Sequence, residues 1–356
     1  MPAVPFDSII APARERNGMT MRKLLGLGIA LAVLAAIMMV PVGGGTMTPG
    51  SSAPRVQAMD LSAFPATPPK AGLRLLFIHH SCGGHLFADS GERSGENCIY
   101  TTHPNGGGLR GLLVAQGYEV HEASYGSAIG EKTDIFDWPP KFAGMMEEIL
   151  ACDGQDKAYA GGQRNDIVAF KSCYPNSDFT GLGAPPGNPA GPELTVWNAK
   201  AAYAALLPEF AKHPGVLFVC LTAPPIVAGK LPPEPLWKSL ARAVLKRERE
   251  KPATSGPLAR EFNNWLVAAD GWLKDYSGKN VVVFDYYDIL TAEGRSDYAE
   301  FPTGGGGNSH PSAEGNAKAA RAFVPFLNQA ARRAGYWTTF NRFQDALSPQ
   351  LNQLLL

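Results

Sequence analysis

Chemically competent side chains follow an apolar segment near the start of the chain. Residues 73–78 are almost entirely apolar, and the sequence HHSC comes directly after them. Ser81 stands in this group, before two glycines that allow a tight turn. A serine after a strand is exposed at the carboxyl edge of a sheet, where backbone N–H groups can point at a developing oxyanion. Ser81 is therefore a candidate nucleophile, although its position also suits a helix N-cap.

A candidate base stands in the segment GGGGNSHPSAEGN, residues 304–316. Pro311 and Ser312 are typical of a helix start, so His310 is predicted on a loop between a Gly-rich segment and that helix. A general base must be held in place and still be reachable, and this position meets both demands. The alternative for His310 is an ordinary surface histidine.

Two further segments could supply hydrogen-bond donors to an oxyanion. Asn176 lies in a polar turn after the apolar segment 166–171, and its amide could donate without a change of charge. Gly130 lies in the turn after the segment 118–123, and its backbone N–H could do the same. Both positions are also compatible with plain turn residues.

In this order along residues 72–332, the four segments resemble the SGNH (GDSL-like) hydrolase superfamily. The sequences IHHS, FKSCYPNS and HPSAEGN give this resemblance its detail. It implies a flavodoxin-like fold with Ser81 as nucleophile and His310 as base. It also implies an oxyanion hole made of the Ser81 N–H, Gly130 and Asn176.

The chain departs from the pattern of that superfamily at three places. His79-His80 stand where Gly-Asp precedes the serine, and Asn176 falls one place late in its motif. Gly307 occupies the place of the acid three residues before His310. A carboxylate there would hold the imidazole tautomer and stabilise the imidazolium. A backbone carbonyl, Asn308 or Asp297 is then required to orient His310.

Two other chemistries compete with a serine hydrolase. His79, His80 and His85 lie close in sequence and could activate water at a metal ion. Adjacent residues of a strand point to opposite faces, however, and no carboxylate has ligand spacing, so no metal is expected. Cys82 could act as nucleophile only with a base of its own.

The elements that must position these residues alternate along the chain. Short apolar segments predict strands, and segments with apolar residues at helical spacing lie between them. This alternation predicts a three-layer α/β/α sandwich with a mostly parallel, five-stranded sheet. Residues 175–192, rich in Gly, Pro and Asn, predict a long loop. The strands are expected at 73–79, 118–123, 166–171, 215–221 and 280–286, and the helical patterns at 203–210, 237–244 and 262–273.

The N-terminal segment predicts export. Leu24–Val42 is uncharged and apolar, with Arg22 and Lys23 before it, which is the layout of a secretory signal or a signal anchor. Cleavage and anchoring both remain open. The predicted organisation is a signal or anchor segment with linker at 1–58, a hydrolase-like domain at 59–340 and a tail at 341–356. The domain is expected outside the cytoplasm, in contact with a membrane only through the first segment.

The charge balance and the cysteine spacing exclude some classes of binding partner. Residues 1–58 carry five of the 32 basic and two of the 32 acidic residues, which leaves 27 basic and 30 acidic residues. This balance lacks the excess of positive charge that is typical of a nucleic-acid-binding domain. The five cysteines lack the paired spacing of a zinc site, and in an exported protein they allow one or two disulfides.

The sequence thus predicts an exported serine esterase that needs no cofactor. Its expected substrates are small-molecule or polysaccharide esters, with O-acetyl carbohydrate among them. An acyltransferase that uses the same serine and histidine is the first alternative. A non-catalytic carbohydrate-binding domain is the second, because Gly307 and His79-His80 depart from the catalytic pattern.

Overall fold

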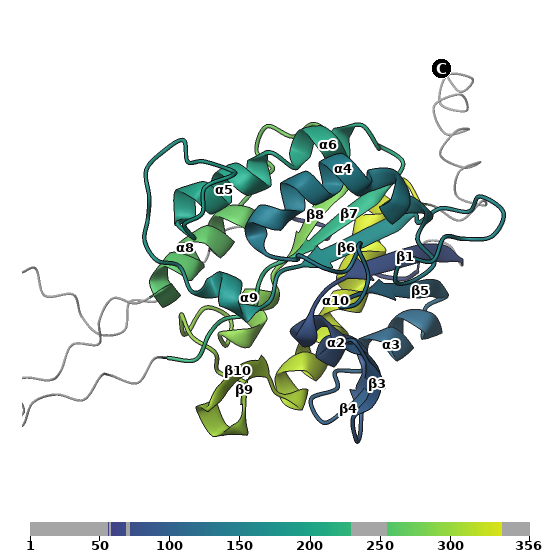
Figure 1. The fold of residues 1–356 in the computed structure, drawn as a ribbon, viewed down its shortest axis with the longest axis horizontal. Coiled ribbons are helices and arrows are strands. Elements are labelled where there is room, and N and C mark those ends of the chain that lie inside the picture. Colours follow the sequence, from purple (N-terminus) through teal and green to yellow (C-terminus); the bar gives the residue numbers. More distant parts are fainter. Residues whose placement is uncertain (1–55, 57, 69–71, 229–254, 337–356) are drawn as a thin grey trace, which may run out of the picture. The chain divides into compact units, whose positions relative to one another are not determined.

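Five parallel strands form the central sheet of the computed structural model, which describes residues 56, 58–68, 72–228 and 255–336 (Figure 1). Their order is β5-β1-β6-β7-β8, and all four pairings are parallel. The predicted fold class and the five predicted strands are confirmed. The strands are β1 (Leu73–Ile78), β5 (Tyr118–Ala123), β6 (Ile167–Lys171), β7 (Leu217–Leu221) and β8 (Val281–Phe284).

Helices cover both faces of this sheet and enclose two apolar cores (Figure 1). The apolar side chains of successive strand residues alternate between the two cores, as the period of a strand requires. One face is covered by α4 (Trp138–Ala151), α5 (Val196–Ala204), α6 (Leu207–Ala211) and α8 (Ser255–Val267). The other is covered by α2 (Ser81–Phe87), α3 (Leu109–Ala115) and α10 (Ala313–Arg333), while the short α9 (Tyr286–Leu290) follows β8.

The direction of strand addition reverses beside β1. The chain moves from β1 to β5 on one side and then to β6 on the other. In open parallel sheets ligands bind beyond the carboxyl ends of the strands at such a reversal. The residues after β1 and β6 therefore border the expected site.

Short elements that the sequence did not predict lie around this edge. A small sheet forms from β2 (Asp89–Ser90), β3 (Ser94–Glu96) and β4 (Ile99–His103). A second pairs β9 (Pro302–Thr303) with β10 (Asn308–Pro311). Both small sheets contact α2, so they flank the residues that follow β1. The single-turn 3-10 helices are η1 (Ile135–Asp137), η2 (Tyr174–Ser177) and η3 (Gly304–Gly306).

Two sequence predictions near the site need correction. Gly83 and Gly84 were expected in a tight turn, but both lie inside α2, which begins at Ser81. His310 was expected on a loop, but it lies on β10, because residues 308–311 pair with β9. The predicted helix start is confirmed, since Ser312 is the N-cap of α10 and its hydroxyl accepts the Gly315 N–H.

Two predicted helical patterns extend across helix ends. The apolar spacing over 203–210 spans the end of α5 and the start of α6, because Pro208 lacks the N–H that a continuous helix needs. The apolar pattern over 262–273 continues beyond the end of α8 at Val267. Trp272 still packs in the core and donates its indole N–H to the Tyr203 carbonyl.

Several predictions fall outside the described residues. These are the apolar stretch Leu24–Val42, the helical pattern at 237–244 and the tail at 341–356. All described residues belong to one compact unit, residues 52–356. Within the described ranges, no helix is both long and apolar enough to cross a membrane. The predicted segment boundaries stay predictions.

Close packing of α2 makes its second glycine sensitive to substitution. A Cβ on Gly84 would stand 1.9 Å from the backbone oxygen of Cys98, whereas a Cβ on Gly144 in α4 would meet no atom within 4 Å. We expect Gly84→Ala to lower the free energy of unfolding by roughly 1–3 kcal/mol, the usual cost of overpacking. Gly144→Ala should raise it by up to about 1 kcal/mol. Equal effects in urea unfolding would contradict this packing of α2.

Candidate active site

The two strand ends at the reversal bring Ser81 against Cys173. Ser81 is the first residue of α2 and is half-buried, while Cys173 follows β6 and is buried. The Ser81 Oγ lies 3.2 Å from the Cys173 Sγ. The predicted nucleophile therefore lies at the carboxyl edge between β1 and β6.

His310 borders the same edge through two neighbours. Its ring centroid lies 5.1 Å from that of His85, which follows Ser81 by one turn of α2. On its other side it lies 4.9 Å from the ring of Tyr174, the residue after Cys173. The fold thus brings His310 to the elements that hold Ser81, although more than two hundred residues separate them in sequence.

Asn308 fixes the tautomer of His310. The Asn308 Oδ1 lies 3.0 Å from the His310 backbone N and 2.7 Å from its Nδ1. Because a backbone N–H only donates, the atom that accepts it must be the amide oxygen, and Nδ1 must then carry its own hydrogen. Nε2 is left without a hydrogen and can accept a proton.

Burial keeps His310 neutral. Desolvation lowers the pKa of His310 below its ordinary value, and the positive charge of Lys171 acts in the same direction, while Cys173 opposes it. A histidine with a lowered pKa stays unprotonated at neutral pH, which is the state that a general base requires.

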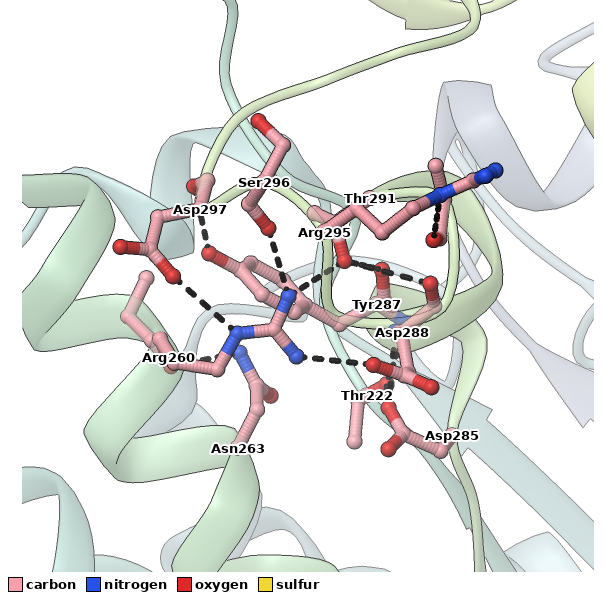
Figure 2. Close-up of polar contacts among 12 residues, drawn as sticks. Thr222, Arg260, Asn263, Asp285, Tyr287, Asp288, Thr291, Arg295, Ser296 and Asp297 are labelled. Carbon is pink, nitrogen blue, oxygen red and sulfur yellow. Dashed lines mark hydrogen bonds and ion pairs between the residues drawn. The ribbon is translucent and has the colours of Figure 1, made fainter. Parts of the chain in front are cut away.

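The other predicted orienter, Asp297, belongs to a different network (Figure 2). Its carboxylate lies 3.3 Å from the Arg260 Nε, and its backbone oxygen accepts the Tyr287 hydroxyl. Arg260 also pairs with Asp288 at 2.9 Å. Of the two residues proposed to orient His310, only Asn308 contacts it.

Gly130 is engaged within its own turn. Its N–H donates to the Ser127 hydroxyl at 2.8 Å, and its carbonyl oxygen lies 2.8 Å from the His80 Nε2. A Cβ at this position would lie 2.0 Å from the Ser124 oxygen, so the close approach of two chain segments requires glycine. In this arrangement the N–H has an internal acceptor, and the oxyanion role of Gly130 stays a prediction.

Asn176 also has internal partners. Its Oδ1 accepts the Ile135 N–H at 2.8 Å, and its Nδ2 donates to Asp134 at 2.6 Å. An amide nitrogen carries two hydrogens, so one remains for another acceptor. The side chain fastens η2 to η1, and its role as an oxyanion donor stays a prediction.

A charge network lies under α2. His79 is fully buried, and its Nε2 lies 2.9 Å from Glu122 on β5. Burial raises the pKa of Glu122, but the contacts with His79 and Arg110 outweigh it and hold that pKa below its ordinary value. A Cβ on Gly83 would lie 2.4 Å from the His79 Cβ, so α2 rests directly on this histidine. His79 thus supports the helix that carries Ser81.

The histidines considered as metal ligands contact separate groups. His79 meets Glu122, and His80 points at the Gly130 oxygen, with its ring stacked on Tyr125 at 3.7 Å. His85 instead stacks on His103, with ring centroids 3.8 Å apart. In the described part of the chain, no three His, Cys, Asp or Glu side chains form a group that could hold a metal ion.

All five cysteines are free thiols in this structure, so the disulfides that the sequence allowed are not formed. Cys82, the second residue of α2, is fully buried, with its Sγ 3.2 Å from the Cys173 Sγ. Burial raises the pKa of Cys82 well above its ordinary value, which makes this thiol a poor nucleophile.

Sequence reasoning missed four residues of this edge, namely His103, Lys171, Cys173 and Tyr174. One signal was present for Lys171, because a lysine ends an otherwise apolar strand. A fully buried lysine is rare unless its charge is balanced. The stacking of His103 on His85 depends on the small sheet of β2, β3 and β4. No periodic pattern in the sequence predicts that sheet.

Comparisons with known proteins give limited similarity. No family model matches the chain, and no curated protein matches it. A proposed acylhydrolase from Bacteroides fragilis superposes with a TM-score of 0.38 at 14% identity, over 79% of this chain and 100% of that one. A catalytic mutant of an acetylxylan esterase from Geobacillus stearothermophilus gives 0.34 at 13% identity, over 76% and 98%.

The fold is the one that the resemblance to SGNH hydrolases implies. The five-stranded parallel sheet and the helices on both of its faces carry this statement. The two superpositions are too weak to assign a role to any residue, so each assignment rests on the geometry of this chain.

Substitutions at Asn308 test the orientation of His310. Asn308→Ala removes the acceptor of Nδ1, and we expect ester hydrolysis to fall at least tenfold. Asn308→Asp keeps an acceptor and adds a negative charge, which raises the pKa of His310 because an opposite charge favours imidazolium. The acid limb of the pH–rate profile should therefore move to higher pH in Asn308→Asp. An unchanged acid limb in Asn308→Asp, together with full activity in Asn308→Ala, would contradict the assignment of Asn308 as the residue that orients His310.

Acid should weaken the fold through His85. Burial lowers the pKa of His85 to about 3, so the unfolded chain binds a proton there at a higher pH than the folded chain does. This stability is complete above the ordinary histidine pKa and is lost as the pH falls below it, by up to about 1.4 kcal/mol per pH unit. His85→Phe should flatten the fall in unfolding free energy between about pH 6.5 and 4. If the unfolding free energies of the wild type and His85→Phe fall equally with pH over this range, the assignment to His85 is contradicted.

Proposed function

We propose that the chain is a serine hydrolase that cleaves O-acyl esters with Ser81 as nucleophile and His310 as base. One observation supports this above all. The Asn308 oxygen accepts both N–H groups of His310, which leaves Nε2 as a proton acceptor at the edge that holds Ser81. A hydroxyl and a neutral imidazole held in this way are the requirements of nucleophilic acyl transfer.

In the proposed mechanism the Ser81 proton moves to the His310 Nε2 as Oγ bonds to the ester carbonyl carbon. The tetrahedral intermediate then collapses, the C–O bond to the alcohol breaks, and the imidazolium returns the proton to the leaving oxygen. Water, deprotonated by the same Nε2, then attacks the acyl carbon, the bond from that carbon to the Ser81 Oγ breaks, and the imidazolium returns its proton to Oγ as the acid leaves. Asn308 keeps Nδ1 as a donor throughout. A neutral amide stabilises the imidazolium less than a carboxylate would, so moderate turnover is expected.

We further propose an exported protein with O-acetylated carbohydrate as the substrate class. The apolar, uncharged stretch Leu24–Val42 after two basic residues supports export. Tyr125 supports a ring-bearing alcohol, because its partly exposed ring lies on His80, the residue before the nucleophile. A flat apolar face with a polar tip suits contact with a sugar.

The test is ester hydrolysis by purified variants, with 4-nitrophenyl acetate and acetylated xylan as substrates. Ser81→Ala and His310→Ala should each lower kcat at least about 10³-fold, as loss of a nucleophile or its base does. Two matched controls should keep wild-type rates. Ser177→Ala removes a buried hydroxyl that has no partner in the described residues, and His213→Gln changes a histidine outside the site.

Wild-type rates in both Ser81→Ala and His310→Ala would overturn the proposed mechanism. A wild-type protein that binds acetylated xylan but hydrolyses neither substrate would instead favour the carbohydrate-binding alternative. Product analysis with a sugar acceptor present distinguishes an acyltransferase from a hydrolase. A transferase moves the acyl group to the sugar, whereas a hydrolase transfers it to water and gives the free acid.

A further inference from the structure

Two thiols lie in contact beside the proposed nucleophile. Cys82 is the second residue of α2, next to Ser81, and Cys173 follows β6. Their Sγ atoms lie 3.2 Å apart, although 91 residues separate the two positions in sequence. The Ser81 Oγ lies 3.2 Å from the Cys173 Sγ, so the three side chains meet at one place. The reversal of strand order beside β1 thus brings together two cysteines that lie on different elements.

The other three thiols contact groups that are not cysteines. The Cys98 Sγ lies 3.4 Å from the Tyr100 hydroxyl oxygen, and the Cys152 Sγ donates to the Gln155 carbonyl oxygen at 2.8 Å. Cys220 lies on β7, inside the core on the α4 face of the sheet. All five cysteines are among the described residues, and the pair beside the nucleophile is the one whose sulfur atoms meet.

The two sulfurs are close to the separation that a covalent bond requires. In a disulfide they lie about 2.05 Å apart, so this pair has to approach by roughly 1 Å. Small rotations about the two Cα–Cβ bonds supply this movement, because each sulfur is attached directly to its Cβ. The elements that carry the thiols can therefore keep their places.

We propose that Cys82 and Cys173 form a reversible disulfide, which links the first turn of α2 to the end of β6 beside Ser81. In this reaction both S–H bonds break and one S–S bond forms. The two electrons and two protons pass to a small external disulfide such as oxidised glutathione, which becomes two thiols. The structure shows the reduced state of the pair, in which the two elements already lie together.

The thiols meet the oxidant while the chain folds. In the folded protein Cys82 is 0% exposed and Cys173 is 8% exposed, so little of either side chain reaches solvent. Before α2 packs onto the strand ends, both thiols are accessible. A chain that folds outside the cytoplasm, as proposed for this protein, meets an oxidising environment at that stage. Burial then protects the bond from reduction.

The disulfide acts on the unfolded chain and on the site. It joins residues that are 91 positions apart, and a cross-link of this kind lowers the conformational entropy of the unfolded chain. It also ties Cys82, the residue after Ser81, to the residue whose sulfur contacts the Ser81 hydroxyl. The place of Ser81 is then held by a covalent bond as well as by packing.

The first experiment is peptide mapping of the full-length chain, refolded from the reduced, denatured state in a buffer of reduced and oxidised glutathione. The remaining thiols are blocked with N-ethylmaleimide, and the chain is cut with trypsin. Cleavage after Lys and Arg places the five cysteines in five different peptides. We expect residues 75–93 joined to residues 172–200, with the other three cysteines blocked. Dithiothreitol should separate the joined peptides.

The second experiment is unfolding in urea. The oxidised wild type should unfold at a urea concentration roughly 1 M higher than the same protein in dithiothreitol. Cys173→Ala should lose this difference, because Cys82 then has no partner for a bond. The matched control Cys220→Ala removes a buried thiol outside the pair and should keep the difference.

Five blocked thiols in the refolded wild type would overturn the proposal, as would glutathione on Cys82 or Cys173, or a link between any other two peptides. A linked wild type whose urea midpoint does not rise would also overturn it, because a bond that fits the folded chain has to stabilise it. If Cys173→Ala does not fold, the mapping of the wild type still decides. Neither experiment measures ester hydrolysis, so the disulfide and the proposed function can fail separately.

Discussion

The packing of α2 onto the end of β1 is the constraint on which the site depends. Gly83 lies directly over the buried ring of His79, and Gly84 lies against the backbone of Cys98. Without side chains at these two positions the helix can sit close to the strand ends, and its first residue, Ser81, then meets Cys173 across the reversal of strand order. A helix held further away would separate the hydroxyl from both β6 and β10.

This close packing places ionisable groups in the interior, and two neighbours balance the buried carboxylate of Glu122. The side chains of His79 and Arg110 both contact the Glu122 carboxylate. Partnered charges of this kind fix one arrangement of the elements that carry them, because a buried charge without its partner is costly. Glu122 ties β5 to β1 and α3, while Cys173 ties β6 to α2. The edge of the sheet is thus held by polar contacts as well as by apolar packing.

The sheet could be predicted from sequence because its strands are continuous apolar segments between turns, and local composition decides such segments. Ser81 and His310 could also be named, since each stands at the boundary of a recognisable element. Asn308 was one of several candidates to orient His310, and only the conformation of β10 shows which of them contacts the ring. The contact between Ser81 and Cys173 could not be predicted, because it joins residues far apart in the chain. The same is true of His103 and its stack on His85.

Labelling with a fluorophosphonate, followed by peptide mapping, tests the central claim most directly, because the reagent reacts with a serine only when that serine is activated. Our account predicts one labelled residue, Ser81, and a large loss of labelling in His310→Ala. Label on a different residue, or undiminished labelling of Ser81 in His310→Ala, would contradict the account.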